Sequence, residues 1–419
     1  MKKRIETNVR SEIGKLNAVI LHTPGKEVEN MTPSNTERAL YSDVLNLKVA
    51  SKEHSEFKEV LDKVAKTYEV RELLEDILTN EKVKEELVRD IVKNEDIPEI
   101  LETLLRMEPA ELSRQLIEGV VMEKNTLTKY LSQERYSLRP LHNFFFTRDA
   151  SIAINDKILI GKMAGRVRER EALIMEAIFK YHSDFSTRVV NPVKDRPADN
   201  KIQIEGGDIL IAREDILLIG TGARTTSQGI DYIIDQLRNK NEKRHIIVQE
   251  LPFSPESFIH LDMVFTIIDN DKCVVYEPLI TTPNRFDTVH ITIDNGKVKN
   301  IQKKDHITDV LKELGMDLKP IPCGGSKDQW FQEREQWHSG ANFFAVGPGK
   351  IIGYGRNTRT LEALNKNGLE VIKAKDIIKG KKDLKDYEKY IVAIEGSELA
   401  RGGGGARCMT MPISRETVK

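Results

Sequence analysis

Asp208-Ile-Leu-Ile-Ala-Arg-Glu-Asp-Ile-Leu-Leu-Ile-Gly220 is the stretch that indicates the fold. Asp208 precedes a short apolar run, the charged pair Glu214 and Asp215 forms a turn signal, and a second apolar run follows. Two apolar runs of strand length around a short polar turn are typical of a β-hairpin. We therefore predict a hairpin over residues 208–220.

The same plan recurs in three other segments, which begin at Asp149, Asp262 and Asn342. Equivalent units repeated roughly every 50 to 80 residues indicate a stacked or radial arrangement rather than one open sheet. Apolar residues at helical spacing follow three of the four hairpins. These predicted helices cover residues 168–181, 226–238 and 360–367.

The two ends of the chain supply a fifth unit in this prediction. Residues 16–22 form a buried apolar strand, and the segment at Cys408 provides its partner. Their pairing brings the chain ends together and closes a propeller-like ring, an arrangement that leaves no exposed sheet edge. The predicted class is therefore α/β.

Residues 71–131 differ in composition from the rest of the chain. Their apolar residues recur at helical spacing, with breaks near Asn80, Asn94 and Pro109. A proline at this position suits the first turn of the next helix. We predict a small helical bundle inserted into a domain formed by residues 1–70 and 132–419, with a structural role.

Composition narrows the possible partners. The 419 residues include 65 lysines and arginines against 66 acidic residues, a net charge of -1 that gives no support for nucleic acid or an anionic membrane as a partner. The three cysteines form no close pair, which indicates neither a disulfide framework nor a metal motif. Without a signal peptide or an apolar run of ~18 residues, we expect a cytoplasmic protein.

A lone thiol in the last loop is the first candidate for chemistry. Cys408 follows the four glycines Gly402–Gly405 and Arg407. Glycines permit close approach to a ligand, and a neighbouring cation lowers a thiol pKa. A buried structural cysteine is the alternative, which this stretch alone leaves open. Cys273 and Cys323 lack acid–base neighbours, so we interpret both as structural.

A ring would direct the residue before each first strand toward one centre. Side chains two apart in a strand share a face, so His260 and Asp262 are expected to point the same way. A thiol, an imidazole and carboxylates around one cavity suit nucleophilic attack on a cation. The candidates are Asp149, Asp208, Asp262, Asn342 and Cys408, with Asn143, Arg148, Glu205 and His260 close upstream.

Four ordered motifs resemble those of arginine deiminases, in the guanidine-modifying superfamily. The motifs are Phe146-Thr-Arg-Asp149, Glu205-Gly-Gly-Asp208, His260-Leu-Asp262 and Arg401-Gly-Gly-Gly-Gly-Ala-Arg-Cys408. The resemblance spans essentially the whole chain, including the helical insertion. It implies a five-bladed propeller of ββαβ units. It also implies hydrolysis of free L-arginine by water to L-citrulline and ammonia, with neither cofactor nor metal.

The resemblance implies a role for each motif residue. Cys408 attacks the guanidinium carbon and forms a covalent S-alkylthiouronium, while His260 protonates the leaving nitrogen and then activates water. Asp149 and Asp262 hold the guanidinium nitrogens through charge-assisted hydrogen bonds, and Glu205 flanks the substrate and the histidine.

The amino-acid end of the substrate requires cations. Arg168 and Arg224 match the carboxylate-binding arginines, whereas we expect the neighbouring Arg166 and Arg170 on the surface. Many family members carry a second arginine in the last loop where this chain has Gly403, so Arg401 or Arg407 substitutes for it or arginine binds more weakly. The remaining substrate-binding candidates are Asn143, Phe146 and Gly402.

Several other functions stay open on sequence alone. A hydrolase of agmatine or dimethylarginine and an amidinotransferase share the guanidine chemistry, although agmatine lacks the carboxylate that Arg168 and Arg224 would bind. A non-catalytic propeller that binds ribosomal particles needs neither Cys408 nor His260. A metallohydrolase is disfavoured because histidine and cysteine pairs at metal-binding spacing are missing. We expect a homo-oligomer, whose subunit number the sequence does not give.

Overall fold

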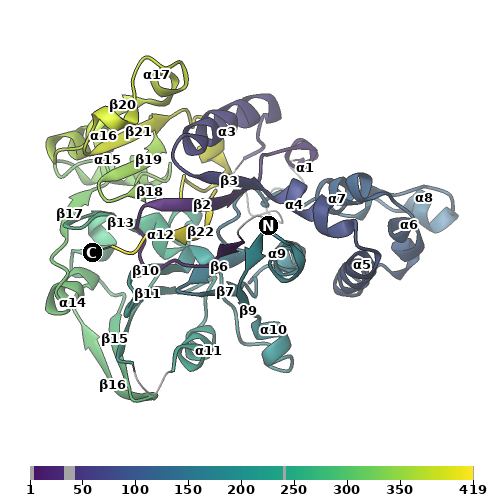
Figure 1. Cartoon of the computed structure of the whole chain (residues 1–419), viewed down its shortest axis with the longest axis horizontal. Coiled ribbons are helices and arrows are strands. Elements are labelled where there is room, and N and C mark those ends of the chain that lie inside the picture. The colour runs from purple at the N-terminus through teal and green to yellow at the C-terminus, as the bar shows by residue number, and fades with distance from the viewer. Residues whose placement is uncertain (1–3, 33–42, 239–241, 419) are drawn as a thin grey trace.

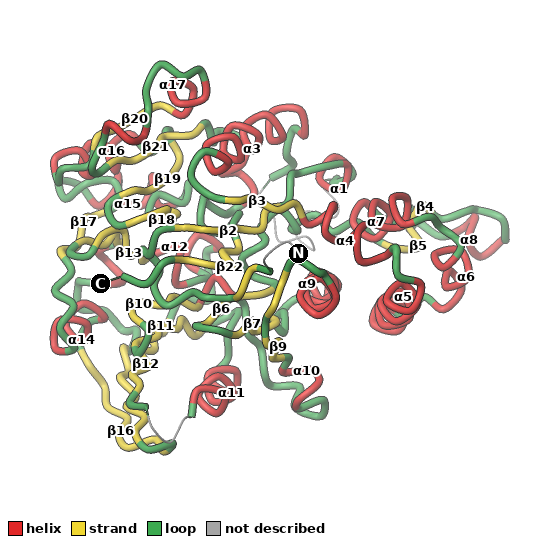
Figure 2. The backbone as a smooth tube through the Cα atoms, viewed as in Figure 1, coloured by secondary structure: helices red, strands yellow, loops and turns green. Residues whose placement is uncertain are grey.

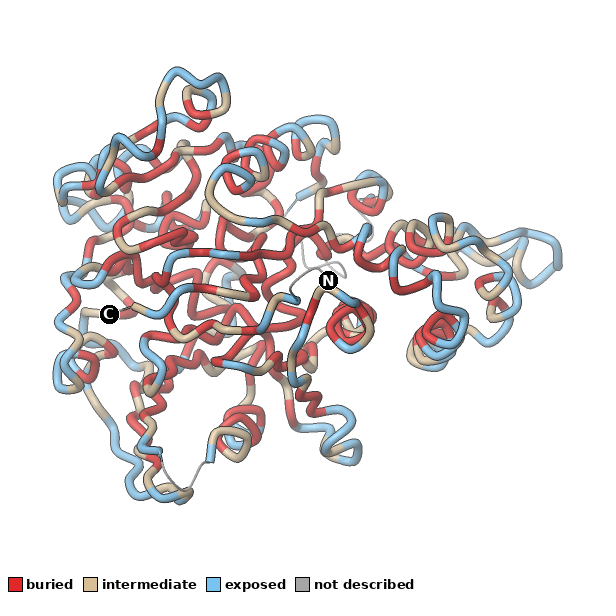
Figure 3. The backbone as a smooth tube through the Cα atoms, viewed as in Figure 1, coloured by how far each residue is buried: buried red, intermediate tan, exposed pale blue. Residues whose placement is uncertain are grey.

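The structure is a computed structural model that describes residues 4–32, 43–238 and 242–418. It has a mixed α/β fold whose strands form several small sheets with helices around them (Figures 1 and 2). Buried segments concentrate in these sheets, and exposed segments lie on the outer helices (Figure 3). None of the described helices has both the length and the hydropathy of a membrane-spanning segment.

Five sheets repeat one plan. In each, two strands pair antiparallel, and one of these two also pairs parallel with a third strand. The four hairpins predicted from the sequence are all present. In spatial order the strands are β6 (Ser151–Ile154), β7 (Lys157–Ile160) and β9 (Arg188–Val190); β10 (Ile209–Arg213), β11 (Ile216–Thr221), β12 (Arg244–Glu250), β15 (Thr288–Asp294) and β16 (Lys297–Lys304); β13 (Phe265–Asp269), β14 (Lys272–Val275) and β17 (Lys319–Pro322); β18 (Phe344–Gly347), β19 (Lys350–Tyr354), β21 (Tyr390–Ile394) and β20 (Glu370–Lys373); and β22 (Met411–Arg415), β2 (Leu16–Leu21) and β3 (Lys66–Glu69).

A helix precedes the parallel strand in each of these sheets, as a parallel connection requires a crossover. The three helices predicted at 168–181, 226–238 and 360–367 are confirmed, with bounds shifted by at most two residues. The Thr226 hydroxyl accepts a hydrogen bond from the Gly229 amide, which explains why the second of them begins there. The five helices are α9 (Glu169–Tyr181), α11 (Ser227–Leu237), α14 (Ile307–Glu313), α16 (Thr358–Lys366) and α3 (Leu47–Asp62).

The two chain ends meet in one sheet, as predicted. β2 pairs antiparallel with β22, with Ile20 opposite Met411, and Figure 1 shows the purple β2 beside the yellow β22. Because β22 begins only three residues after Cys408, this pairing fixes the position of the thiol loop.

One strand prediction is wrong. Residues 262–264 belong to the short helix α12 (Leu261–Val264), and the strand begins only at Phe265. His260 is the residue that precedes this helix, so strand alternation does not explain why His260 and Asp262 lie near one another.

The other short elements are α1 (Lys26–Glu29), α10 (Pro192–Asp195), α13 (Glu277–Ile280), α15 (Gln329–Gln336), α17 (Ala374–Ile378), and the paired strands β1 (Ile5–Glu6) and β8 (Phe185–Ser186).

Helices between residues 70 and 131 lie to one side of the sheets (Figure 1). The helix breaks predicted near Asn80, Asn94 and Pro109 are confirmed: Asn80 caps α5, α5 ends at Glu95, and Pro109 occupies the first turn of α7. The buried leucines of this segment join the hydrophobic cluster of the adjacent sheets, and α4 and α5 contact α9. The elements are α4 (Val70–Leu78), α5 (Glu81–Glu95), α6 (Leu101–Leu105), α7 (Pro109–Glu118), β4 (Val120–Val121), α8 (Leu127–Leu131) and β5 (Tyr136–Leu138).

Candidate active site

A cavity of about 40 Å³ lies beside the glycine loop. It has room for only a few water molecules, so a ligand of amino-acid size requires its walls to move. Eight of the ten site residues selected from the sequence line it, and Glu205 and Asp262 lie behind the wall. The lining residues are Asn143, Phe146, Asp149, Arg168, Arg224, Ile259, His260, Met263, Gly402, Gly403, Gly404 and Cys408.

His260 lies between two carboxylates. Its Nε2 atom is 2.9 Å from Glu205 Oε2, and its Nδ1 atom is 3.8 Å from Asp149 Oδ1. Gly207 passes so close that a Cβ there would lie 2.7 Å from His260 Nδ1, so this turn tolerates no side chain. The Glu205 contact fixes the ring and leaves Nδ1 toward Asp149.

The charges in this trio reinforce one another. Burial would lower the pKa of His260, but the negative charge of Asp149 and the hydrogen bond to Glu205 raise it to about 9. Burial would raise the pKa of Glu205, but the hydrogen bond and positive charge of His260, with Arg224, lower it to about 2. At neutral pH the imidazole is therefore protonated and the Glu205 carboxylate is ionised.

Cys408 lies against Asp262. The thiol Sγ is 3.8 Å from Asp262 Oδ2 and 4.0 Å from Oδ1. Asn342 holds the loop from beneath, since its side-chain oxygen accepts hydrogen bonds from the Arg407 and Cys408 amides and its nitrogen donates to the Asp262 carbonyl. Gly404 packs on the Phe146 ring, where a Cβ would come within 2.4 Å.

The expected lowering of the Cys408 pKa is wrong. Burial and the negative charges of Asp262 and Asp149 raise the thiol pKa, and they outweigh Arg407. Cys273 and Cys323 are fully buried, and burial raises their pKa values as well. The three cysteines therefore differ by their neighbours rather than by their burial.

Arg407 belongs to a buried cluster beneath the cavity. Its guanidinium binds Asp262 Oδ2 at 2.8 Å and both carboxylate oxygens of Glu12 at 3.0 Å. Burial would raise the pKa of Glu12, but Arg407, Arg148 and Arg415 lower it to about 2. Sequence reasoning missed Glu12, which is 395 residues from Arg407 and lies in no recognisable motif.

Asp149 uses only one of its oxygens. Its Oδ2 atom accepts a 2.7 Å hydrogen bond from Arg168, which also binds Glu171 at 2.8 Å. The other oxygen, Oδ1, is buried without a hydrogen-bond partner among the described residues. Sequence reasoning also missed Glu171, although its spacing of three residues from Arg168 on a helix is a signal for such a pair.

The candidate gate residues do not reach the cavity. Arg407 is 1% exposed and committed to Glu12 and Asp262, while Arg401 contacts Asp43 and Glu398. Gly403 lines the cavity with a φ of +83°, in the left-handed region that favours glycine. Arg224 lines the cavity with its Nη1 atom 3.8 Å from Glu205.

Three further expectations need correction. Arg170 is buried rather than exposed, although Arg166 is exposed as expected. Asp208 does not line the cavity. Its Oδ1 atom accepts a hydrogen bond from the Leu261 amide, and burial raises the pKa of the Asp208 carboxyl to about 7. Asn342 and Arg148 likewise lie behind the wall.

One group of side chains in the described part of the chain could hold a metal ion: Asp149, Glu205 and His260, whose ligand atoms lie within 4.8 Å of one another. The protonated imidazole between the two carboxylates already supplies a positive charge at this place. A protonated imidazole donates from both nitrogens, so in this protonation state His260 offers no lone pair to a metal ion.

Comparisons with known proteins identify the family of this chain. The sequence model of the family described as arginine deiminase matches residues 37–415. An arginine deiminase of Bacillus cereus strain B4264 is 35% identical over 98% of this chain and 99% of the relative. The chain belongs to the arginine deiminase family. The chain is also 32% identical to the arginine deiminase of Streptococcus pneumoniae serotype 19F, over 98% of both chains.

Solved structures of other proteins share the fold of this chain. SxtG, an amidinotransferase from Microseira wollei, superimposes with a TM-score of 0.55 at 14% identity over 98% of both chains. The N-terminal domain of ArgZ, an arginine dihydrolase of cyanobacteria, gives 0.53 at 12% identity over 96% of this chain and 99% of that domain. Identities this low support the shared α/β fold alone.

Proposed function

We propose that this chain hydrolyses free L-arginine to L-citrulline and ammonia and that Cys408 is the nucleophile. Membership of the family supports the activity. The observation that carries the site assignment is the buried Asp149 Oδ1 atom at the cavity that Cys408 and His260 also line: among the described residues it has no hydrogen-bond partner, and His260 Nδ1 is 3.8 Å away. A planar cation with several N–H donors satisfies that oxygen and brings its central carbon toward the thiol.

Substrate binding activates the nucleophile in this proposal. Asp262 and Asp149 disfavour a thiolate, and a bound guanidinium neutralises part of their charge. The thiol proton passes to water, from which the sulfur regains a proton after it leaves the product. The thiolate attacks the guanidinium carbon, and a tetrahedral adduct forms. Positioning against Asp149 and Asp262 matters because a resonance-stabilised cation is a poor electrophile.

His260 transfers the protons. With Nε2 held by Glu205, Nδ1 is the nitrogen that faces the cavity at Asp149. The imidazolium protonates the departing nitrogen, ammonia leaves, and Cys408 keeps the carbon as an S-alkylthiouronium. The neutral imidazole then accepts a proton from water, whose oxygen attacks the same carbon, and citrulline forms as the thiolate leaves.

Replacement of Asp149 tests the thiol environment. In Asp149→Asn we expect the pKa of Cys408 to fall, because one of the negative charges that raise it is removed. The measurement is the rate of iodoacetamide alkylation of the ligand-free protein against pH. Asp156→Asn, in an exposed turn, serves as the control and should leave the titration unchanged. An identical midpoint in Asp149→Asn and wild type would contradict the role of Asp149.

The substrate carboxylate is assigned to Arg224 and Arg168. Of the two, Arg224 is the less committed, because its contact with Glu205 is 3.8 Å long whereas Arg168 binds Asp149 and Glu171 closely. Asn143, Phe146 and Gly402 complete the wall around the aliphatic part of the substrate.

Arg224→Ala is expected to raise the KM for arginine by about tenfold or more, because a charge-assisted pair is lost. Any turnover of agmatine should change far less, since agmatine has no carboxylate. Steady-state kinetics on both compounds measures this difference. Equal effects on the two would show that Arg224 acts on the site as a whole.

A colorimetric citrulline assay with purified protein tests the function directly. Arginine should yield citrulline and equimolar ammonia, and agmatine and dimethylarginine should be poor substrates. Product formation that requires an added amine acceptor would instead indicate an amidinotransferase. A ribosome-binding propeller would give no product from any of the three.

The finer architecture belongs to the same proposal. The five sheets with their hairpin, helix and parallel strand suit the blades of a five-bladed propeller, built from residues 1–70 and 132–419 around the cavity. Residues 71–131 are then an inserted helical bundle. We further propose that the protein is a cytoplasmic homo-oligomer. Size-exclusion chromatography with light scattering measures its number of subunits.

A further inference from the structure

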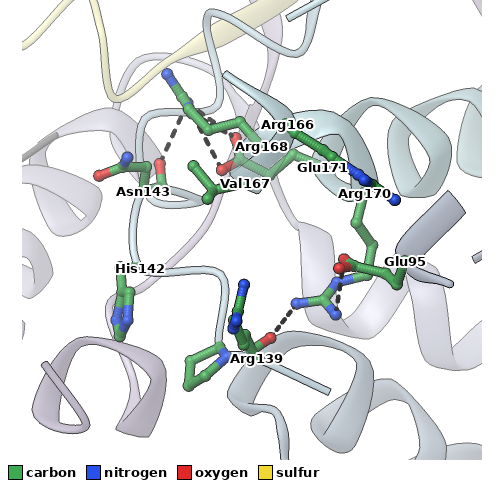
Figure 4. Close-up of a pocket in the computed structure, with 10 residues that line it drawn as sticks. Glu95, Arg139, His142, Asn143, Arg166, Val167, Arg168, Arg170 and Glu171 are labelled. Atoms are coloured by element: carbon green, nitrogen blue, oxygen red, sulfur yellow. Dashed lines mark hydrogen bonds and ion pairs between the residues drawn. The ribbon is translucent and has the colours of Figure 1, made fainter. Parts of the chain in front are cut away.

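A second, larger cavity lies between the helical segment and α9. Its volume is about 200 Å³, against about 40 Å³ for the candidate active site. Figure 4 shows the side chains around it: Arg139 comes from the loop after β5, Arg170 from α9, and Glu95 from the end of α5. Arg168 and Asn143 line both cavities.

The wall carries an excess of positive charge. Four arginines, Arg139, Arg166, Arg168 and Arg170, face two acids, Glu95 and Glu171. Glu171 is bound to Arg168, Glu95 lies near Arg170, and Arg139 also pairs with Glu134 outside the cavity lining. The first turn of α9 lies at the same wall, and the amides of a helix N-terminus add positive potential.

Arg170 is the observation that points to a ligand. Its side chain is 1% exposed, and its Nε and Nη1 atoms have no hydrogen-bond partner among the described residues. Glu95 lies 3.2 Å away without hydrogen-bond geometry, and the remaining donor, Nη2, contacts the Arg139 carbonyl. A buried guanidinium with two unused donors is costly unless an acceptor reaches it.

We propose that this cavity binds a small, doubly charged oxyanion of the phosphate class. The oxyanion accepts hydrogen bonds from Nε and Nη1 of Arg170, and Arg139 and Arg166 add positive charge at the same wall. Its site is distinct from the place of the substrate guanidinium, because Arg168 stands between Asp149 and the larger cavity.

Binding there acts on the substrate through Arg168. An anion beside Arg168 attracts its guanidinium away from Asp149 and competes with the substrate carboxylate for it. This consequence rests on the function proposed above, whereas binding of the anion does not. The oxyanion therefore raises the KM for arginine while changing kcat less.

The binding test uses inorganic phosphate and the substrate-free full chain. Isothermal titration calorimetry, against sodium chloride at equal ionic strength, should give saturable binding that Arg170→Gln and Arg139→Gln each weaken by about tenfold. Arg139 is half-exposed, so its variant keeps the test valid if Arg170→Gln fails to fold. Acetate, with one charge, should bind more weakly than phosphate.

Arg89→Gln is the matched control, because Arg89 lies on α5, whose end contributes Glu95 to the cavity, and pairs with Glu85 outside the cavity. It should bind phosphate as wild type does. Phosphate binding that neither cavity substitution weakens, or no binding at all, overturns the proposed anion site. Binding lost in Arg224→Ala but kept in Arg170→Gln places the anion in the candidate active site and overturns it too.

Kinetics then tests the coupling. Phosphate should raise the KM for arginine in wild type and in Arg89→Gln, and should leave it unchanged in Arg170→Gln. A KM that stays constant at saturating phosphate in wild type would overturn the link through Arg168. An inactive wild-type chain that still binds phosphate would refute the proposed function and leave the anion site standing.

Discussion

Cys408→Ser is expected to abolish citrulline formation, with a loss of about 10⁴-fold or more, because removal of a catalytic nucleophile costs losses of that order or larger. A serine hydroxyl between the negative charges of Asp262 and Asp149 ionises far less readily than a thiol. The fold should persist, since the substitution replaces one buried atom with a smaller one. The measurement is citrulline release in single-turnover and steady-state assays.

Arginine binding separates loss of chemistry from loss of structure. Cys408→Ser should still be stabilised against heat by arginine, because Asp149, Arg224 and His260 are intact. Cys273→Ser and Cys323→Ser are the matched controls, as both thiols are buried away from the cavity, and any defect in them should appear in stability rather than in kcat. Full activity in Cys408→Ser would reject the nucleophile.

Glu12→Gln is expected to produce the largest loss of stability, about 3–5 kcal/mol, because removing one partner of a buried ion pair leaves an uncompensated charge. Without Glu12, the buried guanidinium groups of Arg148 and Arg407 keep Asp262 as a neighbouring acid, and Arg415 loses the acid whose charge acts on it. Urea unfolding followed by circular dichroism measures the change in the midpoint.

The pH dependence of this loss has a definite sign. The folded pKa of Glu12 is about 2, below its ordinary value of 4.5, so its stabilisation is complete above about pH 4.5 and is lost as the pH falls toward 2. The difference between wild type and Glu12→Gln should therefore shrink in acid. Glu416→Gln is the control, since the Glu416 and Lys15 pair is exposed and worth little. An equal effect of the two substitutions would remove Glu12 from this role.

Local patterns predicted the secondary structure because each carries its own physical signal. The hairpin at 208–220 shows its turn and its two apolar runs, and Pro109 marks a helix start through its fixed φ. The exception is instructive: residues 261–264 are as apolar as a strand, yet they form one helical turn whose first amide is held by Asp208. A tertiary contact determines the helical conformation of these residues, and the local sequence pattern does not contain that contact.

The sequence predicted which residues meet at one cavity, but it did not predict the electrostatics there. Motifs selected residues such as Cys408 and Asp149, which line one cavity. The direction of the thiol pKa was wrong because adjacency of Arg407 in sequence suggested a cation beside the sulfur, whereas Glu12 and Asp262 already bind that guanidinium. Long-range pairing of charges leaves no trace in a local window of residues.

The pairing of β2 with β22 has a consequence for biosynthesis. The strand that positions Cys408 is translated long after the strand with which it pairs. The Cys408 loop therefore reaches its place only after β22 has left the ribosome, and contacts so distant in sequence form slowly. A nascent chain stalled before residue 411 should carry folded hairpins and show no citrulline formation.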